Sequence, residues 1–196
     1  LSGLALVTFL LHFSHHVFSA VFVLYAAYRY NWHAWEVGVL LALVGVLDMI
    51  VQGLLVGRVT KRLGDRTTMV LGLFGGAAGI ALMGLAPTGL IFTLAMIPNA
   101  LWGLAMPTLQ SLMTQHVSES EQGQLQGATM SVASIAGVAS PLFFGSVYAF
   151  SIGDRLATPF PGLSFLIASV VLLAAALLGW LVARRAGRAE AQEQMS

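Results

Sequence analysis

The chain has 196 residues and a formal net charge of +1, and its charged residues make up only 9% of it. A soluble domain carries charge on about a quarter of its residues, so this chain cannot coat a water-exposed surface and its solvent is lipid. It has no cysteine, which excludes disulfides and thiolate sites, and its near-neutral charge implies no nucleic-acid partner. Composition therefore predicts an all-α integral membrane protein embedded in a lipid bilayer.

Six apolar stretches reach the length of about 20 residues that crosses a bilayer. They are Leu4–Tyr28, Trp35–Gly57, Thr67–Ala86, Leu90–Met113, Gln124–Phe150 and Leu163–Ala183. We expect residues 1–183 to form a six-helix transmembrane bundle and residues 184–196 to form a polar cytoplasmic tail. The chain begins with Leu1 rather than Met, so we expect it to be a fragment.

The first span carries three histidines, His12, His15 and His16, at spacings that place them on one side of a helix. Histidine titrates near neutral pH, which suits a proton relay or a gate for a cationic ligand. No Asp or Glu in this span completes a ligand set for a metal, so no metal site is predicted. Alternatively, these histidines hydrogen-bond Ser14, Ser19 or backbone carbonyls in a packed bundle.

The second span contains Asp48, an acid well inside an apolar stretch. A charge at the bilayer centre costs about 2.5–3.5 kcal/mol, so such residues usually face a cavity or a partner. A buried carboxyl there could bind and release a proton, and Gln52 lies one turn later on the same face. We therefore expect Asp48, with His12 and His16, to take part in proton coupling. The alternative is a structural acid paired with a neighbouring helix.

A charged segment of ten residues, Gly57-Arg-Val-Thr-Lys-Arg-Leu-Gly-Asp-Arg66, joins the second and third spans. Gly57 is expected to end one helix, and Gly64 can supply the left-handed turn that a short connection needs. Lys61 and Arg62 near one helix end and Asp65 near the next helix start have favourable signs for the helix dipoles. On its residues alone, the segment is either a solvated turn or part of a functional motif.

The fourth span is interrupted by Pro98 and Pro107, which kink a membrane helix where a cavity or a neighbour re-satisfies the backbone. Polar and small residues recur along it at helical spacing. The expected substrate-cavity residues are His15, Gln52, Asn99, Gly103, Met106 and Gln110. A purely structural kink is the alternative.

The remaining spans carry fewer polar residues. The fifth opens with Gly123, Gly127 and Ser131 at four-residue intervals, which lets another helix approach closely. The third and sixth spans contain almost nothing polar, so we expect them to be the lipid-facing pair.

The basic residues are distributed unequally between the two sides of the bilayer. Six spans put both chain ends on one side, and that side holds seven of the nine Lys and Arg residues. These are Arg58, Lys61, Arg62, Arg66, Arg184, Arg185 and Arg188, whereas Arg29 and Arg155 lie on the other side. The positive-inside bias predicts a multi-pass cell-membrane protein, in a bacterial inner membrane, with both ends in the cytoplasm.

Several motifs carry a family resemblance. The spacing of Gly57, Lys61, Arg62, Gly64, Asp65 and Arg66 between two spans resembles the loop signature of the major facilitator superfamily. Four further stretches resemble the tetracycline-resistance branch of its drug:proton antiporters, in the right order along nearly the whole chain. They are Gly103-Leu-Ala-Met-Pro107-Thr-Leu-Gln110-Ser111, Gln122-Gly-Gln-Leu-Gln-Gly127, Arg29-Tyr-Asn-Trp32 and Ser140-Pro141-Leu142.

The resemblance implies the carboxyl-terminal half of a twelve-helix transporter, because the first-half copy of the loop usually has an acid where this chain has Lys61. It implies six helices in a 3+3 inverted repeat, whose first and fourth helices line a central cavity, and a missing amino-terminal six-helix half. The implied activity is export of a small amphipathic organic compound by alternating access, driven by the proton gradient with no other cofactor. Tetracycline exporters tend to carry an acid where this chain reads Gly75-Gly76, so tetracycline is not the expected substrate.

Two other classes remain as alternatives. The chain could be a non-transporting six-span scaffold or a small homodimeric channel; a homodimer of a fragment would be non-physiological. An intramembrane enzyme is disfavoured, because the sequence contains no Gly-x-Ser-x-Gly, no His-Glu-x-x-His and no paired membrane acids. An upstream domain with six further spans would distinguish a transporter half from these alternatives.

Overall fold

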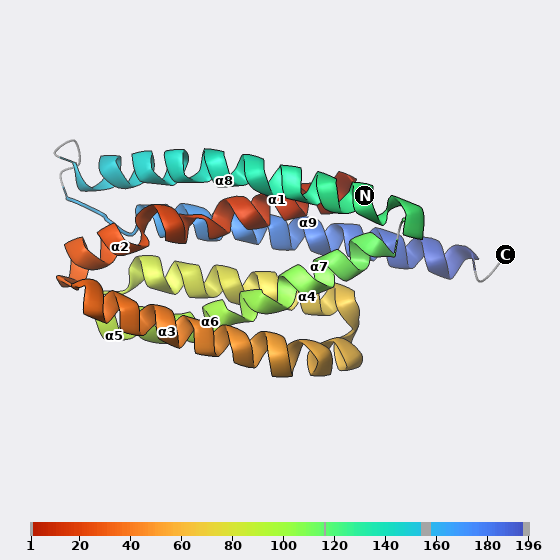
Figure 1. Ribbon diagram of the computed structural model, residues 1–196, viewed down its shortest axis with the longest axis horizontal. Coiled ribbons are helices and arrows are strands. Elements are labelled where there is room, and N and C mark those ends of the chain that lie inside the picture. The colour runs from red at the N-terminus through yellow and green to blue at the C-terminus, as the bar shows by residue number, and fades with distance from the viewer. Residues whose placement is uncertain (1, 116, 154–157, 194–196) are drawn as a thin grey trace.

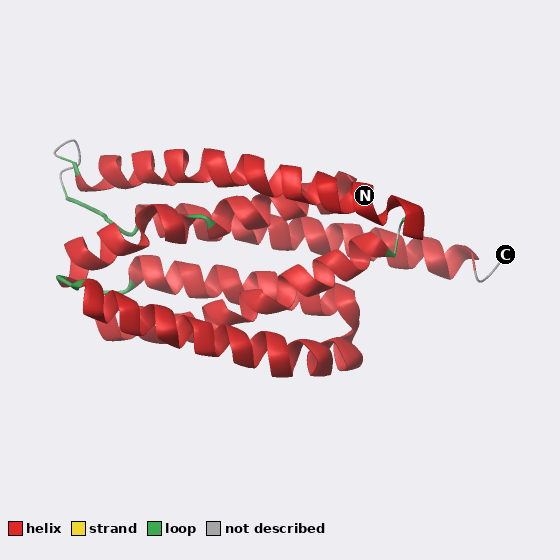
Figure 2. Cartoon of the chain, viewed as in Figure 1, coloured by secondary structure: helices red, strands yellow, loops and turns green. Residues whose placement is uncertain are grey.

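The computed structural model describes residues 2–115, 117–153 and 158–193, and within these ranges the chain is helical except for short turns (Figure 2). The helical elements are α1 Ser2–His15, α2 Val17–Tyr30, α3 Ala34–Ile50, the π-helix η1 Val51–Leu55, α4 Val56–Leu85, α5 Gly89–Leu94, α6 Met96–Ala100, the 3₁₀ turn η2 Leu101–Leu104, α7 Ala105–Thr114, the 3₁₀ turn η3 Glu119–Glu121, α8 Gln122–Ile152 and α9 Leu163–Glu193. The all-α prediction is confirmed.

Among the described residues, five helical stretches are long and apolar enough to cross a membrane, and the longest contains two spans. That stretch, Ala34–Leu85, has 52 residues and would measure roughly 78 Å if straight, against a hydrocarbon core of about 30 Å. It reverses direction at Gly64, whose φ of 75° and ψ of 162° interrupt α4 (Figure 1). The six expected spans are therefore all present.

Gly64 makes this reversal because only glycine adopts such a backbone conformation without strain. The Thr68 hydroxyl donates a hydrogen bond of 2.8 Å to the Gly64 carbonyl and secures the start of the next span. The expectation that Gly57 ends a helix is wrong, because α4 runs through it without interruption. Glycine costs only about 1 kcal/mol inside a helix, so the helix continues until Gly64 turns it.

The first and fourth spans are both discontinuous. A turn at His16 separates α1 from α2, and the fourth span is divided into α5, α6, η2 and α7. A proline ring clashes with the carbonyl four residues earlier. For Pro98 this is the carbonyl of Leu94, where α5 ends, and for Pro107 it is the carbonyl of Gly103, within η2. The predicted proline kinks are confirmed.

The six spans pack in a crossed pattern. The first span, α1 with α2, packs against α8 and α9, whereas the fourth span packs against α4, and through α6 and η2 against α3 and η1. The first span therefore lies against the fifth and sixth spans, and the fourth span lies against the second and third. Two inverted repeats of three helices each produce this pattern. Figure 1 shows the beginning of α1, the Gly64 turn and the end of α9 at one end of the bundle, which we call the Gly64 end.

The third and sixth spans pair with each other, since α4 and α9 form the most extensive helix pair of the described bundle. Both helices also keep large apolar side chains exposed, such as Phe74 at 40% and Leu177 at 55%. Two glycines of α4 also allow the fourth span to pack closely against this helix. A Cβ on Gly75 would lie 2.7 Å from the Leu101 Cβ, and one on Gly76 would lie 2.9 Å from the Trp102 Cβ. Gly75-Gly76 therefore form a contact with the fourth span that leaves no room for a carboxylate.

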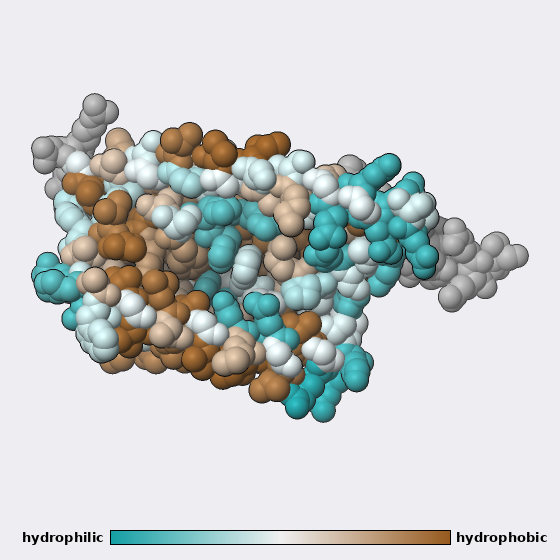
Figure 3. All heavy atoms as spheres, in the orientation of Figure 1, coloured by the Kyte–Doolittle hydropathy of each residue, from teal (hydrophilic) through white to brown (hydrophobic). Residues whose placement is uncertain are grey.

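The second and fifth spans are the most open to their surroundings. Large apolar side chains of α3 and α8 are exposed, including Trp35 at 77% and Leu142 at 70%. Gly123 and Gly127 of α8 have no neighbouring atom within 4 Å of an added Cβ, so no helix among the described residues approaches closely at these two positions. Figure 3 shows hydrophilic side chains gathered in the middle of one face, with hydrophobic side chains along both rims.

Candidate functional site

A pocket of about 380 Å³ lies between α2, α3, α6 and the last residue of α1. Its polar lining residues are His15, Ser19, Asp48 and Asn99. Its apolar lining residues are Phe18, Phe22, Val23, Leu41, Val44, Met96 and Trp102. Its lining residues come from the first span (α1 and α2), the second (α3) and the fourth (α6 and η2), so the pocket is built where three spans meet. Such an apolar cavity with a few convergent polar groups is typical of a small-molecule site.

Asp48 supplies a carboxyl group to this pocket from the last turn of α3. The side chain is half-buried, and the lining residues include no lysine or arginine. The π-helix η1 begins three residues later; such bulges are frequent at functional sites. The pocket therefore presents one acid on an otherwise apolar and aromatic wall.

Trp102, which sequence reasoning missed, lines the same pocket beside His15. The two rings are stacked with centroids 4.0 Å apart and planes 10° from parallel. The Trp102 Nε1–H is buried and has no hydrogen-bond acceptor among the described residues. An unpaired buried donor of this kind carries a desolvation cost with no compensating hydrogen bond.

The other predicted cavity residues divide between two places. Met106 and Gln110 line a smaller cavity of about 160 Å³ that also contacts Gln122 and Gln126 of α8. Gln52 is exposed and lies beside Gly103, where an added Cβ would be 3.5 Å from the Gln52 Cγ. Gly103 therefore keeps the second and fourth spans close rather than lining the Asp48 pocket.

The three histidines point to different neighbours. His15 stacks on Trp102 of the fourth span, whereas a Cβ on Gly137 of α8 would lie 3.4 Å from the His16 Nε2. His12 is half-buried one turn earlier on α1. Among the three, His15 alone lines the Asp48 pocket. A direct His12 or His16 relay to Asp48 has no contact supporting it in the described structure.

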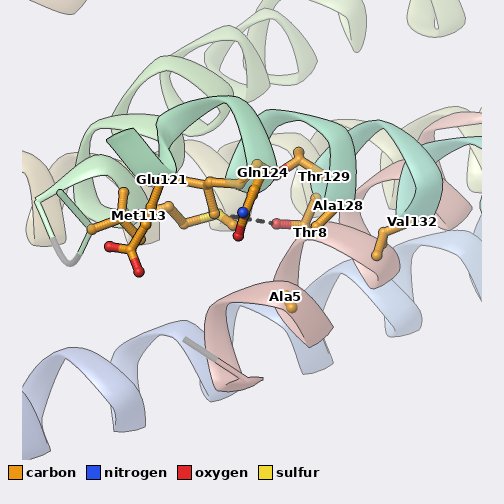
Figure 4. A pocket seen from close by; sticks show the side chains of 10 residues that line it. Ala5, Thr8, Met113, Glu121, Gln124, Ala128, Thr129 and Val132 are labelled. Atoms are coloured by element: carbon orange, nitrogen blue, oxygen red, sulfur yellow. Dashed lines mark hydrogen bonds between the residues drawn. The ribbon is translucent and has the colours of Figure 1, made fainter. Parts of the chain in front are cut away.

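A further pocket of about 370 Å³ lies near the Gly64 end, between α1, α7, η3 and α8. Figure 4 shows Glu121 and Gln124 beside it, together with the hydrogen bond from the Thr8 hydroxyl to the Met113 sulfur, 3.6 Å long. Glu121 lies in the connection before α8, where the Ser118 hydroxyl and the Ser118 N–H donate to its carboxylate and lower its pKa. The mouth of this pocket therefore holds an ionised acid at neutral pH.

In the predicted loop motif, Asp65 joins two spans. The Ser111 hydroxyl donates a hydrogen bond of 2.5 Å to the Asp65 Oδ2, and the Gln115 amide nitrogen donates one of 3.3 Å. Both donors belong to the end of the fourth span. Lys61 and Arg62 are exposed. The acid of the motif therefore ties the beginning of the third span to the fourth.

The chain belongs to the Major Facilitator Superfamily, whose profile matches residues 4–195. It is 30% identical over 172 residues to the tetracycline resistance protein class C of Escherichia coli, a match that covers 88% of this chain and 42% of that protein. It is 31% identical over 153 residues to the class G protein of Vibrio anguillarum, covering 78% of this chain and 39% of that protein.

A third relative is a lysosomal proton-coupled steroid conjugate and bile acid symporter of Gallus gallus, 29% identical over 124 residues, with 63% of this chain and 26% of the relative covered. The chain spans about two fifths of the length of the two bacterial relatives. The fold, the family and these relatives make it a multi-pass membrane segment of a transporter.

Proposed function

We propose that this chain is the carboxyl-terminal half of a proton-coupled secondary transporter that exports a small amphipathic organic compound by alternating access. The observation that carries the proposal is the pocket in which Asp48, His15 and Asn99, from three spans, meet aromatic side chains of the first and fourth spans. A lone acid beside apolar rings can bind either a proton or a cationic group of a compound. Competition between these two ligands for one carboxyl couples export to proton entry.

The missing half of the transporter would cover the face that carries this pocket. α3, which lines the pocket, and α8, which packs against α2, both carry exposed apolar side chains. This chain matches 42% and 39% of two relatives, which supports six further spans in a partner domain. With the positive-inside bias, the Gly64 end, which holds Lys61 and Arg62, faces the cytoplasm. The proposed location is a bacterial inner membrane with both ends of this chain in the cytoplasm.

Tetracycline is not the substrate we propose, although two of the relatives are tetracycline resistance proteins. The position where the resemblance led us to look for an acid is filled by helix contacts at Gly75 and Gly76. The Asp48 pocket has one acid and several aromatic rings, which suits a lipophilic organic cation.

The test is uptake into everted membrane vesicles that contain the full protein carrying this chain. Ethidium, tetraphenylphosphonium and tetracycline are offered separately while respiration makes the vesicle interior acidic. We expect accumulation of at least one of the two organic cations, and its loss when an ionophore collapses the proton gradient. If none of the three compounds accumulates in a gradient-dependent way, the proposal fails and the scaffold or channel alternative is favoured.

A further inference from the structure

Three amide side chains meet in the smaller cavity of about 160 Å³, which lies between α1, α7 and α8. They belong to Gln110 of α7 and to Gln122 and Gln126 of α8, and all three glutamines are exposed. Gln122 and Gln126 are four residues apart, so their side chains lie on one face of α8. The cavity therefore brings amides of the fourth and fifth spans together.

The hydroxyl groups that line this cavity are already paired, whereas its amides are not. The hydroxyls of Thr8, Thr114 and Thr129 each donate a hydrogen bond of 2.9 Å to a carbonyl of their own helix. The amides of the three glutamines make no hydrogen bond to any described residue. Each amide has two N–H donors and one carbonyl acceptor, so the glutamines are the groups of this cavity that can pair with a bound compound.

The glutamine cavity and the Asp48 pocket lie along the same faces of two spans. On α1, Thr8 lines the cavity and His15 lines the pocket, and residues seven apart share a helix face. On the fourth span, Trp102 lines the pocket and Met106, one turn later, lines the cavity. At the usual rise of a helix, Thr8 lies about 10 Å from His15 along α1. An elongated compound of that length would extend from one site to the other.

We propose that the three glutamine amides bind an uncharged hydrogen-bonding group, such as a carboxamide, of the same compound whose cationic and aromatic part occupies the Asp48 pocket. The inference rests on the proposed function, to which it adds a second part of the substrate site. A carboxamide suits these glutamines, because it both donates and accepts hydrogen bonds as they do. An ionised group is disfavoured, because an amide carries no charge that would balance it.

The test compares the binding of two triphenylphosphonium cations to the full protein that carries this chain. Each cation has an alkyl chain long enough to extend from the Asp48 pocket to the glutamines. One chain ends in a carboxamide and the other in an isopropyl group of nearly the same shape. Equilibrium dialysis of the purified protein gives both dissociation constants. We expect Q110M and Q126M each to reduce the preference for the carboxamide compound roughly fivefold, the usual net contribution of one hydrogen bond.

The matched control is Q124M. Gln124 lies between Gln122 and Gln126 on α8 but lines the other pocket at this end of the bundle (Figure 4), so its replacement should leave the preference unchanged. D48N should weaken the binding of both compounds alike, because they carry the same cation. If both compounds bind in a way that depends on Asp48, but Q110M and Q126M do not change the preference, the inference is overturned and the proposed function stands.

Two further outcomes would also overturn the inference. An unchanged preference, together with lower midpoints of thermal aggregation in Q110M and Q126M than in Q124M, would assign the amides to contact with the other half of the transporter. Failure of both compounds to bind the unmodified protein would count against the Asp48 pocket itself, and therefore against the proposed function as well.

Discussion

Replacing Asp48 by asparagine in the full protein is expected to abolish substrate accumulation driven by a proton gradient. Asp48 is the acid among the residues that line the pocket, and an amide cannot exchange a proton. We expect a loss of at least about fivefold, since coupling between two linked ligands usually corresponds to a factor of 5 to 150. The measurement is initial uptake of ethidium or tetraphenylphosphonium by everted vesicles at several external pH values.

Two controls separate proton coupling from damage to the pocket. D48E keeps a titratable carboxyl and should retain gradient-driven uptake, with an altered pH dependence. Exchange of labelled for unlabelled compound without a gradient should be retained by D48E and reduced in D48N, because the neutral amide, like the protonated carboxyl, offers the cation no counter-charge. Unchanged gradient-driven uptake by D48N at all pH values would remove Asp48 from the mechanism.

Adding a single methyl group at Gly79 is expected to destabilise the bundle. Gly79 lies where α4 crosses α6, and a Cβ there would be 2.5 Å from both the Cα and the Cβ of Asn99. The obstacle is backbone rather than the end of a flexible side chain, so the two helices must separate. Overpacking of this kind typically costs about 1–3 kcal/mol. It should also displace Asn99 in the Asp48 pocket.

The measurement is the midpoint of thermal aggregation of the purified protein, compared with substrate uptake in vesicles. G79A should lower both. G38A is the matched control, because Gly38 lies in α3 with no atom within 4 Å of an added Cβ, and alanine there should be neutral or improve helix stability by up to about 1 kcal/mol. Equal midpoints for G79A and G38A would show that the helix crossing tolerates separation.

The sequence predicted the spans, the Gly64 turn and the breaks in the fourth span, because each depends on residues close together in the chain. Apolar length identified the six spans, Gly64 was recognised as the turn, and Pro98 and Pro107 indicated the breaks in the fourth span. Each of these follows from one residue type acting on its own backbone or from the thickness of a bilayer. Gly57 misled the sequence reading because a glycine weakens a helix without being sufficient to end it.

The composition of the Asp48 pocket depended on contacts between distant segments. His15 and Trp102 are far apart in the sequence, and Trp102 was not among the expected cavity residues. Asn99 was expected in the cavity because of its helical spacing, but the same spacing also included Gly103, Met106 and Gln110, which the structure places elsewhere. Spacing gives the face of a helix but not its neighbour.

Two backbone features had no signal in the sequence. The turn at His16 contains neither glycine nor proline, and the π-helix η1 follows Asp48 in an apolar run. The importance of Gly75-Gly76 was also misread at first, because the sequence suggested a missing acid. The structure shows a positive role, since both glycines allow the fourth span to approach α4.

The most direct test of the central claim, that the Asp48 pocket binds the transported compound, is protection of a thiol placed in the pocket. This chain has no cysteine, so S19C introduces one thiol into the lining, in a protein whose other half is also free of cysteine. S120C, on the exposed connection before α8, serves as the control. We expect saturating ethidium or tetraphenylphosphonium, whichever is transported, to slow alkylation of S19C and leave S120C unchanged. Equal alkylation rates of S19C with and without a compound that the protein demonstrably transports would contradict the account.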